Sequence, residues 1–266
     1  MPTSGGTAVN DQPNPLAVVW SIARARRTRR PKPTGEGLVQ SNEFAEVLSL
    51  LRTDGIAVLP SERGVLARFR YRMEEVDPDA LSVDGALSFW LNLYNAGALA
   101  LAADTLSAGE NTVLRVPGAF DAPWAMVGGE SLSLNDIEHG KIRRFRDPRI
   151  HAALVCGSVS CPTLRYEPFG DNLESQLDSQ MRSFLTGGGA LMERDSGTLQ
   201  LSRVFLWYGG DFVRPARMPT WIPARRRDLA RAIAQWLPNE DANWVIASSP
   251  EVEYATYDWG LACSIA

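Results

Sequence analysis

The cysteines and histidines are the side chains of this sequence whose types best suit nucleophilic chemistry. The chain has three cysteines and two histidines, and Cys161 lies in an expected turn ten residues after His151. A thiol becomes an effective nucleophile when a nearby base or positive dipole favours the thiolate. We therefore predict Cys161 as the candidate nucleophile, with the backbone amide of Val159 or Ser160 able to approach the reacting carbonyl oxygen.

Two histidines could serve as the base, and the sequence alone does not choose between them. His139 follows Glu138 on an expected helix, whereas His151 follows Asp147 and Arg149. Either imidazole has a neighbouring carboxylate that would fix its tautomer.

The same residues allow three other interpretations. Cys156 and Cys161 could be small side chains kept for packing, as free cysteines often are, and Cys263 is interpreted as structural. His139, His151, Cys156 and Cys161 together supply two imidazoles and two thiols, a ligand set that suits zinc. The histidines precede the cysteines, however, unlike those of a zinc finger. In an oxidising compartment Cys156 and Cys161 could form a disulfide.

Residues 84–105 are expected to form a buried helix, because their apolar side chains surround the helix instead of forming one stripe. Asn92 and Asn95 lie one turn apart within it. A buried amide must find hydrogen-bond partners or it destabilises the fold. The two asparagines are therefore either clamps on neighbouring backbone or parts of a polar pocket.

The remaining pattern predicts helices early in the chain and strands late. Further helices are expected at residues 42–55, 61–76, from 133 to before 147, 171–186 and 226–237. Strands are expected at residues 150–155, 190–193, 198–202, 244–247 and 252–257. This order indicates an α+β fold with a mainly antiparallel sheet.

Composition limits the classes of partner. Hydrophobic residues form 45% and charged residues 22% of the chain, which is typical of a globular protein. The net charge of −4 gives nucleic acid no general attraction, so we expect no nucleic-acid partner. We expect no transmembrane segment and find no secretory signal. Three cysteines, an odd number, favour reduced thiols in the cytoplasm.

The sequence divides into three parts. Residues 1–14 are rich in small and polar residues and are expected to form a disordered tail. Residues 15–34 are a basic N-terminal arm, in which residues 16–32 either contact a membrane surface or protein or pack a helix on the domain. Residues 35–266 are predicted to form a single globular domain.

Five ordered sequence blocks resemble a known family. They are FWLNLYNAG, SLNDIEHGKIR, DPRIHAALVCGSVSCPTLR, VFLWYGGDF and YDWGLA. Together they are similar to the family called domain of unknown function 547, over about residues 87–261. The family is found in bacteria and in plants, where it accompanies a leucine-zipper segment, and heptads of that kind are not found in this sequence.

The resemblance implies a papain-like or transglutaminase-like fold, with a buried central helix packed on a mainly antiparallel sheet and extra covering helices. In papain-like enzymes the thiol usually begins the central helix, whereas this helix has no cysteine. Cys161 would then take that role from a turn, or the scaffold would not be catalytic. The family-pattern polar positions in this chain are Asn92, Asn95, Glu138, His139, His151, Cys156, Cys161, Asp211 and Asp258.

We therefore expect a thiol-dependent amide hydrolase or acyl transferase in which Cys161 attacks a carbonyl. His139 is preferred as the base over His151, because Glu138 and the helix that carries Asn92 and Asn95 could frame it. The alternative is a noncatalytic module that binds a peptide or protein on the same scaffold. A zinc-binding domain is the third interpretation, whereas the first two need no cofactor.

Overall fold

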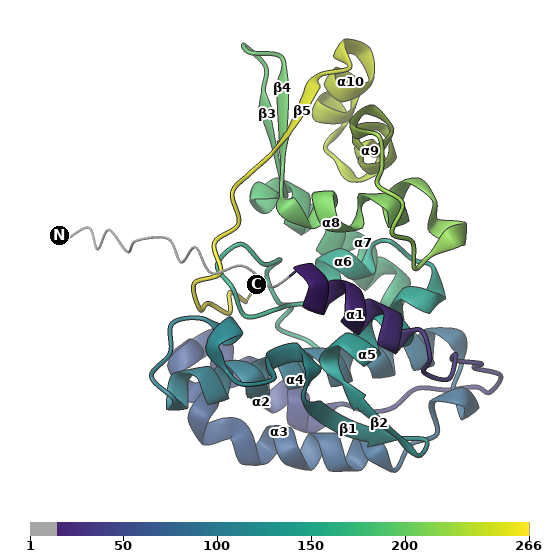
Figure 1. Cartoon of the computed structure of the whole chain (residues 1–266), viewed down its shortest axis with the longest axis vertical. Helices are drawn as coiled ribbons and strands as arrows, with labels where there is room; N and C mark the ends of the chain where they lie inside the picture. The colour runs from purple at the N-terminus through teal and green to yellow at the C-terminus, as the bar shows by residue number, and fades with distance from the viewer. Residues whose placement is uncertain (1–14, 266) are drawn as a thin grey trace.

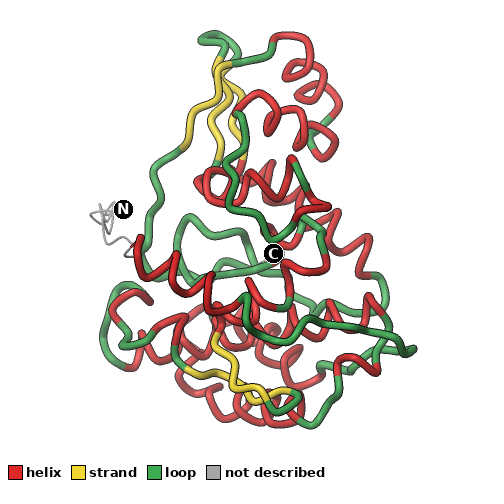
Figure 2. Tube along the Cα trace, turned by 45° about the vertical axis from the view of Figure 1, so that its right-hand side comes forward, coloured by secondary structure: helices red, strands yellow, loops and turns green. Residues whose placement is uncertain are grey.

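The computed structural model describes residues 15–265, and the tail predicted at residues 1–14 lies outside them. Within this part the fold is mixed α+β but mostly helical, with ten α-helices and two small sheets. The helices are α1 (Pro15–Ala25), α2 (Asn42–Asp54), α3 (Leu59–Glu74), α4 (Val83–Ser107), α5 (Leu134–Gly140), α6 (Ile150–Ala153), α7 (Leu173–Phe184), α8 (Arg203–Val213), α9 (Arg226–Ile233) and α10 (Asn239–Ser248). The strands are β1 (Pro123–Val127), β2 (Glu130–Ser133), β3 (Ala190–Glu193), β4 (Thr198–Leu201) and β5 (Glu251–Tyr254). The two sheets lie at opposite ends of the molecule (Figures 1 and 2).

Helix α4 lies at the centre of the larger hydrophobic core, which confirms the predicted buried helix. Ser82 caps it by accepting a hydrogen bond from the Gly85 amide at 3.0 Å. By length and composition α4 could also cross a membrane, but 94% of its most apolar window is buried inside the protein. Packing against the other helices, α3 above all, therefore already uses its apolar surface.

The two asparagines of α4 act as clamps on neighbouring backbone. Asn92 donates a hydrogen bond to the Phe169 carbonyl at 2.8 Å and accepts one from the Phe169 amide at 2.9 Å. Asn95 likewise donates to the Ala153 carbonyl at 2.9 Å and accepts from the Val155 amide at 3.1 Å. Each amide therefore fastens one later segment of the chain to the central helix.

The central helix does not pack on a mainly antiparallel sheet, which corrects the layout implied by the resemblance. Strands β1 and β2 form an antiparallel hairpin against α3 and α5, closed by Gly128 and Gly129 with φ of 58° and 80°. Strand β4 pairs antiparallel with β3 and parallel with β5. Strands of four or five residues are too short to cover the 25 residues of α4, so helices cover it instead.

Two segments predicted as strands are helical. Residues 150–155 begin with helix α6, because Pro148 and two alanines favour a helix there and the Asp147 carboxylate accepts the Arg149 amide at 2.9 Å. Residues 244–247 lie inside α10, since a short apolar run is compatible with either structure. The other predicted helices and the strands predicted at residues 190–193, 198–202 and 252–257 are confirmed, whereas α8 and the hairpin of β1 and β2 were not anticipated.

A second hydrophobic core lies within residues 35–266, which were predicted to form one globular domain. It gathers side chains of α7 to α10 and of the three-stranded sheet, among them Phe205, Leu229 and Val252. Figure 1 shows these elements above α4 and its covering helices. After β5 the chain returns along the molecule to the region of α4, so its last residues contact both parts.

The basic arm binds its own domain. Ala25 at the end of α1 is fully buried against Gly140, where any β-carbon would meet the Ala25 carbonyl oxygen at 2.6 Å. Arg24 forms an ion pair with Asp136 at 3.2 Å, in the first turn of α5. Packing of the arm on the domain therefore occurs, and a contact of residues 16–32 with a membrane surface or protein stays a prediction.

Replacing Asn92 by alanine should lower the free energy of unfolding by about 2–4 kcal/mol, because the Phe169 amide and carbonyl would lose their buried partner. Urea unfolding followed by circular dichroism measures this loss. Asn239→Ala, at an exposed position, is the control and should change stability by no more than about 0.5 kcal/mol. Equal stability of the two variants would contradict the clamp.

Candidate functional site

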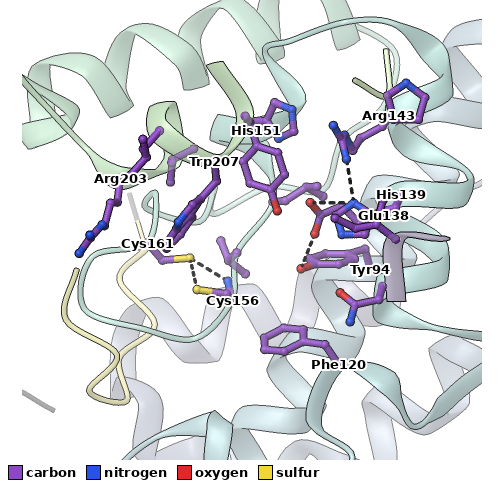
Figure 3. A pocket seen from close by; sticks show the side chains of 18 of the residues that line it. Tyr94, Phe120, Glu138, His139, Arg143, His151, Cys156, Cys161, Arg203 and Trp207 are labelled. Carbon is purple, nitrogen blue, oxygen red and sulfur yellow. Dashed lines mark hydrogen bonds and ion pairs between the residues drawn. The ribbon is translucent and has the colours of Figure 1, made fainter. Parts of the chain in front are cut away.

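A cavity of about 660 Å³ opens where the two hydrophobic cores meet, and it collects most of the chemically active side chains. Figure 3 shows the two cysteines on one side and Glu138 with His139 on the other. The predicted site residues that line it are Glu138, His139, His151, Cys156 and Cys161. Asn92 and Asn95 do not line it, because both are engaged with backbone at the other faces of α4.

The sulfurs of Cys156 and Cys161 touch each other at 2.8 Å, and both thiols are free. The backbone amide of Cys156 also donates to Cys161 Sγ at 2.8 Å. On its other side, Cys156 Sγ lies 3.0 Å from Ser158 Oγ and 3.1 Å from the Tyr257 hydroxyl. Cys156 Sγ therefore lies within hydrogen-bond distance of three groups that can donate a proton, Cys161, Ser158 and Tyr257, and the Ser158 hydroxyl also donates to Tyr257 at 2.9 Å.

These contacts make the two thiols unequal acids. The hydrogen bond from the Cys161 thiol is the main cause that lowers the pKa of Cys156 to about 7, with help from Ser158 and Tyr257. Burial and the neighbouring Cys156 sulfur raise the pKa of Cys161 well above its ordinary value. Near neutral pH the negative charge therefore belongs on Cys156, whereas the sequence singled out Cys161.

Helix α4 and the C-terminal segment position the turn that carries both thiols. Asn95 holds the chain just before Cys156 through the Ala153 carbonyl and the Val155 amide. On the other side, the Val159 amide donates to the Gly260 carbonyl at 2.9 Å. The family-pattern residue Asp258 belongs to this support: its carbonyl accepts the Ser160 amide at 3.3 Å and its own amide donates to Ser160 Oγ at 2.9 Å.

Glu138 and His139 reach the opposite wall from α5. Ser133 and Asp136 form a capping box at the start of this helix. Glu138 lies 3.4 Å from the Tyr94 hydroxyl and 3.5 Å from His139 Nδ1. Burial raises the pKa of Glu138, but the two imidazoles and Tyr208 outweigh that effect and the net pKa is lowered, so Glu138 is a buried carboxylate.

His139 is neutral at physiological pH. Burial is the main cause that lowers its pKa to about 4, and the nearby Arg143 guanidinium adds to the effect although Glu138 opposes it. Arg143 NH1 lies 3.3 Å from His139 Nδ1, where a neutral imidazole can accept a hydrogen bond.

His151 has a better-defined carboxylate partner than His139. Its Nε2 atom lies 3.0 Å from Oδ2 of the fully buried Asp211, and its ring stacks on Tyr208 at 4.0 Å. The same Asp211 oxygen accepts a hydrogen bond from Arg143 at 2.8 Å. Burial opposes ionisation of Asp211, but His151 and Arg143 hold its pKa well below the ordinary range. Burial also lowers the pKa of His151.

Neither imidazole is hydrogen-bonded to a sulfur in the part of the chain that the structure describes. His139 faces Arg143 and Glu138, and His151 faces Asp211. Within residues 15–265 no group of three or more His, Cys, Asp or Glu side chains could hold a metal ion. The four residues of the zinc interpretation thus do not form a ligand set.

Several residues of the site were missed by the sequence analysis. They are Tyr94, Arg143, Arg203, Trp207, Tyr208, Tyr257 and Trp259. The rings of Trp207, Tyr257 and Trp259 pack together at 4.7–5.9 Å between centroids and form an aromatic wall beside the thiols. All but Arg203 lie inside the five sequence blocks, and the tyrosines and tryptophans of three of these blocks were a usable signal.

Comparison with known proteins places the thiols in a recognised domain. Residues 78–185 match the model of a family described as protein of unknown function, DUF547. These residues are a DUF547 family domain. The match includes α4, α5 and both cysteines of the pocket, but it ends before Tyr208, Asp211 and Tyr257.

The other comparisons add no relative. No curated protein and no solved structure matches the chain. The DUF547 family has no known function, and none of these findings relates the chain to papain-like or transglutaminase-like proteins. The chemistry of the pocket therefore has to be inferred from its own residues.

Alkylation of Cys156 by iodoacetamide should follow a titration with a pKa of about 7. Cys161→Ala should move that titration to higher pH, because the variant loses the donor that most stabilises the thiolate. Mass spectrometry of digests at a series of pH values measures the rate for each cysteine. Cys263→Ser, outside the pocket, is the control and should leave the profile unchanged.

Acid should destabilise the protein partly through His139. The folded pKa of about 4 lies below the ordinary value of 6.5, so unfolding takes up a proton between these pH values and stability falls as the pH falls through them. His139 should account for about 3 kcal/mol of this loss, at roughly 1.4 kcal/mol per pKa unit. Urea unfolding at pH 8 and pH 4 should show a smaller pH dependence of the free energy of unfolding for His139→Gln than for the wild type. An unchanged pH dependence would refute a neutral buried His139.

Proposed function

We propose that this protein is a thiol-dependent enzyme that hydrolyses an amide or ester or transfers its acyl group, with Cys156 as the attacking sulfur. The observation that carries the proposal is the contact set of Cys156 Sγ with Cys161, Ser158 and Tyr257 in the wall of a cavity of about 660 Å³. A thiolate needs such donors because burial would otherwise disfavour its charge. Cys161 then serves as the donor that supports the nucleophile.

The Tyr257 hydroxyl is the proton carrier that the geometry supports best. It lies 3.1 Å from Cys156 Sγ, within reach of an atom that leaves a carbonyl under attack by that sulfur. The sulfur bonds to the acyl carbon, the bond to the leaving nitrogen or oxygen breaks, and the leaving atom takes the Tyr257 proton. Water or an acceptor then attacks the thioester, returns a proton to Tyr257 and releases the sulfur as thiolate.

The opposite wall would orient the substrate. Glu138 is a buried carboxylate that can accept a hydrogen bond from an amide N–H, and neutral His139 adjoins it. Asp211, which Arg143 holds by a hydrogen bond, contacts His151 Nε2 and so fixes the orientation of this ring. Figure 3 shows His151 and Arg143 at the top of the pocket. In this proposal the histidines position the substrate, and Tyr257 replaces them as the proton carrier.

The shape and lining of the cavity favour a small or extended acyl substrate with an apolar part. Aromatic side chains of Phe120, Trp207 and Trp259 line it beside the thiols. Arg203 also lines it, and it stands at the first position of α8, where the helix dipole disfavours a cation. A negatively charged group on the substrate would compensate that unfavourable placement.

The proposal shares the thiol chemistry of papain-like and transglutaminase-like enzymes but not their layout. Their nucleophile begins the central helix, whereas the corresponding helix α4 here has no cysteine. The turn after α6 brings the thiol to the pocket, and Asn95 of α4 holds that turn. The proposal therefore includes a distant evolutionary relation to those enzymes, in which the nucleophilic thiol lies in a turn instead of at the start of the central helix.

A noncatalytic binding module is the second candidate, and one observation favours it. Neither imidazole is hydrogen-bonded to a sulfur in residues 15–265, so the thiol lacks the histidine base that most thiol hydrolases use. Such a module would bind a peptide in the same cavity through its aromatic wall. Acyl transfer to the protein distinguishes the two candidates.

Incubation with p-nitrophenyl acetate should transfer one acetyl group to Cys156, because an ester with a good leaving group tests the thiolate without knowledge of the natural substrate. Intact mass and digest mapping should locate the group, and nitrophenol release should fall at least about 10-fold in Cys156→Ala. Tyr257→Phe should slow attachment of the acetyl group far less than Cys156→Ala does, since nitrophenolate leaves without needing a proton.

Two controls separate chemistry from folding. Cys263→Ser should acetylate at the wild-type rate because Cys263 does not line the cavity. Circular dichroism should show that Cys156→Ala keeps the helical content of the wild type. Equal acetylation of Cys156→Ala and wild type would refute Cys156 as the nucleophile, and acetylation of Cys161 instead would assign that role to Cys161. No acetylation of either thiol would leave the binding module as the better candidate.

A further inference from the structure

We infer that Cys156 and Cys161 are a redox modification site, at which a peroxide converts the two thiols into an intramolecular disulfide that a dithiol reductant reverses. The inference stands on the placement of the two sulfurs and does not need the enzyme proposed above. Its consequence for acyl transfer, which is inhibition, does rest on that proposed function.

The distance between the sulfurs is the first observation. They lie 2.8 Å apart, which is only about 0.8 Å longer than a disulfide bond. The Cys156 amide, which donates to Cys161 Sγ at 2.8 Å, keeps the second sulfur against the first. Bond formation would therefore need only a small movement of the side chains.

The backbone around the pair is already folded as a closed turn. Gly157 adopts a φ of 76°, which a residue with a side chain rarely adopts, and so directs the chain back towards Cys161. Ser158 pairs with Leu261 in an antiparallel bridge, and the Val159 amide donates to the Gly260 carbonyl at 2.9 Å. The C-terminal segment thus holds the turn in the geometry that a disulfide would need.

Access and acidity separate this pair from the third thiol. Cys156 and Cys161 both line the cavity, so a molecule as small as hydrogen peroxide can reach them. Cys156 has a pKa of about 7, whereas burial raises the pKa of Cys263 to about 12. Since the thiolate is the form that peroxides oxidise, Cys156 should react first.

The reaction balances with one peroxide for each pair. The Cys156 thiolate attacks one peroxide oxygen, the O–O bond breaks, and the departing hydroxide takes a proton to become water, which leaves a sulfenic acid on Cys156. Cys161 then attacks that sulfur, the S–O bond breaks, and the oxygen leaves as a second water with the Cys161 proton. Two thiols have lost two electrons, and one peroxide has gained them.

The disulfide would inhibit acyl transfer, because it would occupy the sulfur of Cys156 that acts as the nucleophile. A dithiol restores the reduced pair by attack on the disulfide and a second exchange, taking the two electrons back from itself. In the cytoplasm that we propose as the location, the reduced form would be the resting state.

The test is a count of free thiols in the full-length protein. Reduced protein, freed of reductant, is treated with one equivalent of hydrogen peroxide, denatured, and alkylated with N-ethylmaleimide before intact mass and disulfide mapping. Of the three thiols in the wild type, one should remain, with a Cys156–Cys161 disulfide that dithiothreitol reverses. Oxidation of Cys156 should be at least about 100-fold faster than that of Cys263.

Single substitutions of the cysteines test the role of each thiol in the oxidation. Cys263→Ser should form the same disulfide at the same rate. Cys161→Ser should stop at the sulfenic acid of Cys156, which dimedone traps, whereas Cys156→Ser should yield no trapped product at Cys161. Three remaining thiols in the oxidised wild type, a disulfide that includes Cys263, or chains linked to each other would overturn the inference.

The outcomes also separate this inference from the proposed function. A reversible disulfide without acetyl transfer to Cys156 would keep the redox site and reject the thiol enzyme. Acetyl transfer to Cys156 without formation of the disulfide would keep the thiol enzyme and reject the redox site. If both hold, oxidised Cys263→Ser should lose acetyl transfer at least about 10-fold and recover it with dithiothreitol.

Discussion

Helix α4 is buried on all sides along residues 85–99, and this burial shapes the rest of the structure. Helix α4 has no solvent face over most of its length, so neighbouring elements have to enclose it. Its few polar side chains need partners, and Asn92 and Asn95 find them on the backbone of later segments. The same hydrogen bonds that satisfy the buried amides therefore also set the path of the chain towards the pocket.

A second constraint comes from charge inside the protein. Arg143 and Asp211 are almost completely buried, and their ion pair at 2.8 Å is joined by His151 and by the Thr220 amide at 2.9 Å. A buried ion pair does little for stability by itself, but loss of one partner leaves an uncompensated charge. Because Arg143 follows α5 and Asp211 lies on α8, this cluster ties the DUF547 domain to the elements that follow it.

The pocket combines two chemically different walls that the fold keeps apart. One wall holds a polarised pair of thiols beside Tyr257, and the other holds a carboxylate and neutral imidazoles. Low solvent access strengthens the hydrogen bonds and charge interactions in both walls, because the local dielectric constant is lower there than in water. The close approach of Cys156 to Cys161 underlies both the proposed nucleophile and the proposed redox site, because one contact lowers the pKa of Cys156 and shortens the path to a disulfide.

Elements with strong local signals can be read from the amino-acid pattern without the structure. The buried helix α4, the capping box of α5 and the hairpin of β3 and β4 follow from periodicity, capping and turn residues, as does the set of thiols and imidazoles available for chemistry. The helix at residues 150–153, the role of Asn95 as a clamp and the greater acidity of Cys156 became evident only from the folded chain. The reason is that a pKa and a hydrogen-bond partner depend on residues far apart in the chain: Tyr257, which contacts Cys156, follows it by 101 positions.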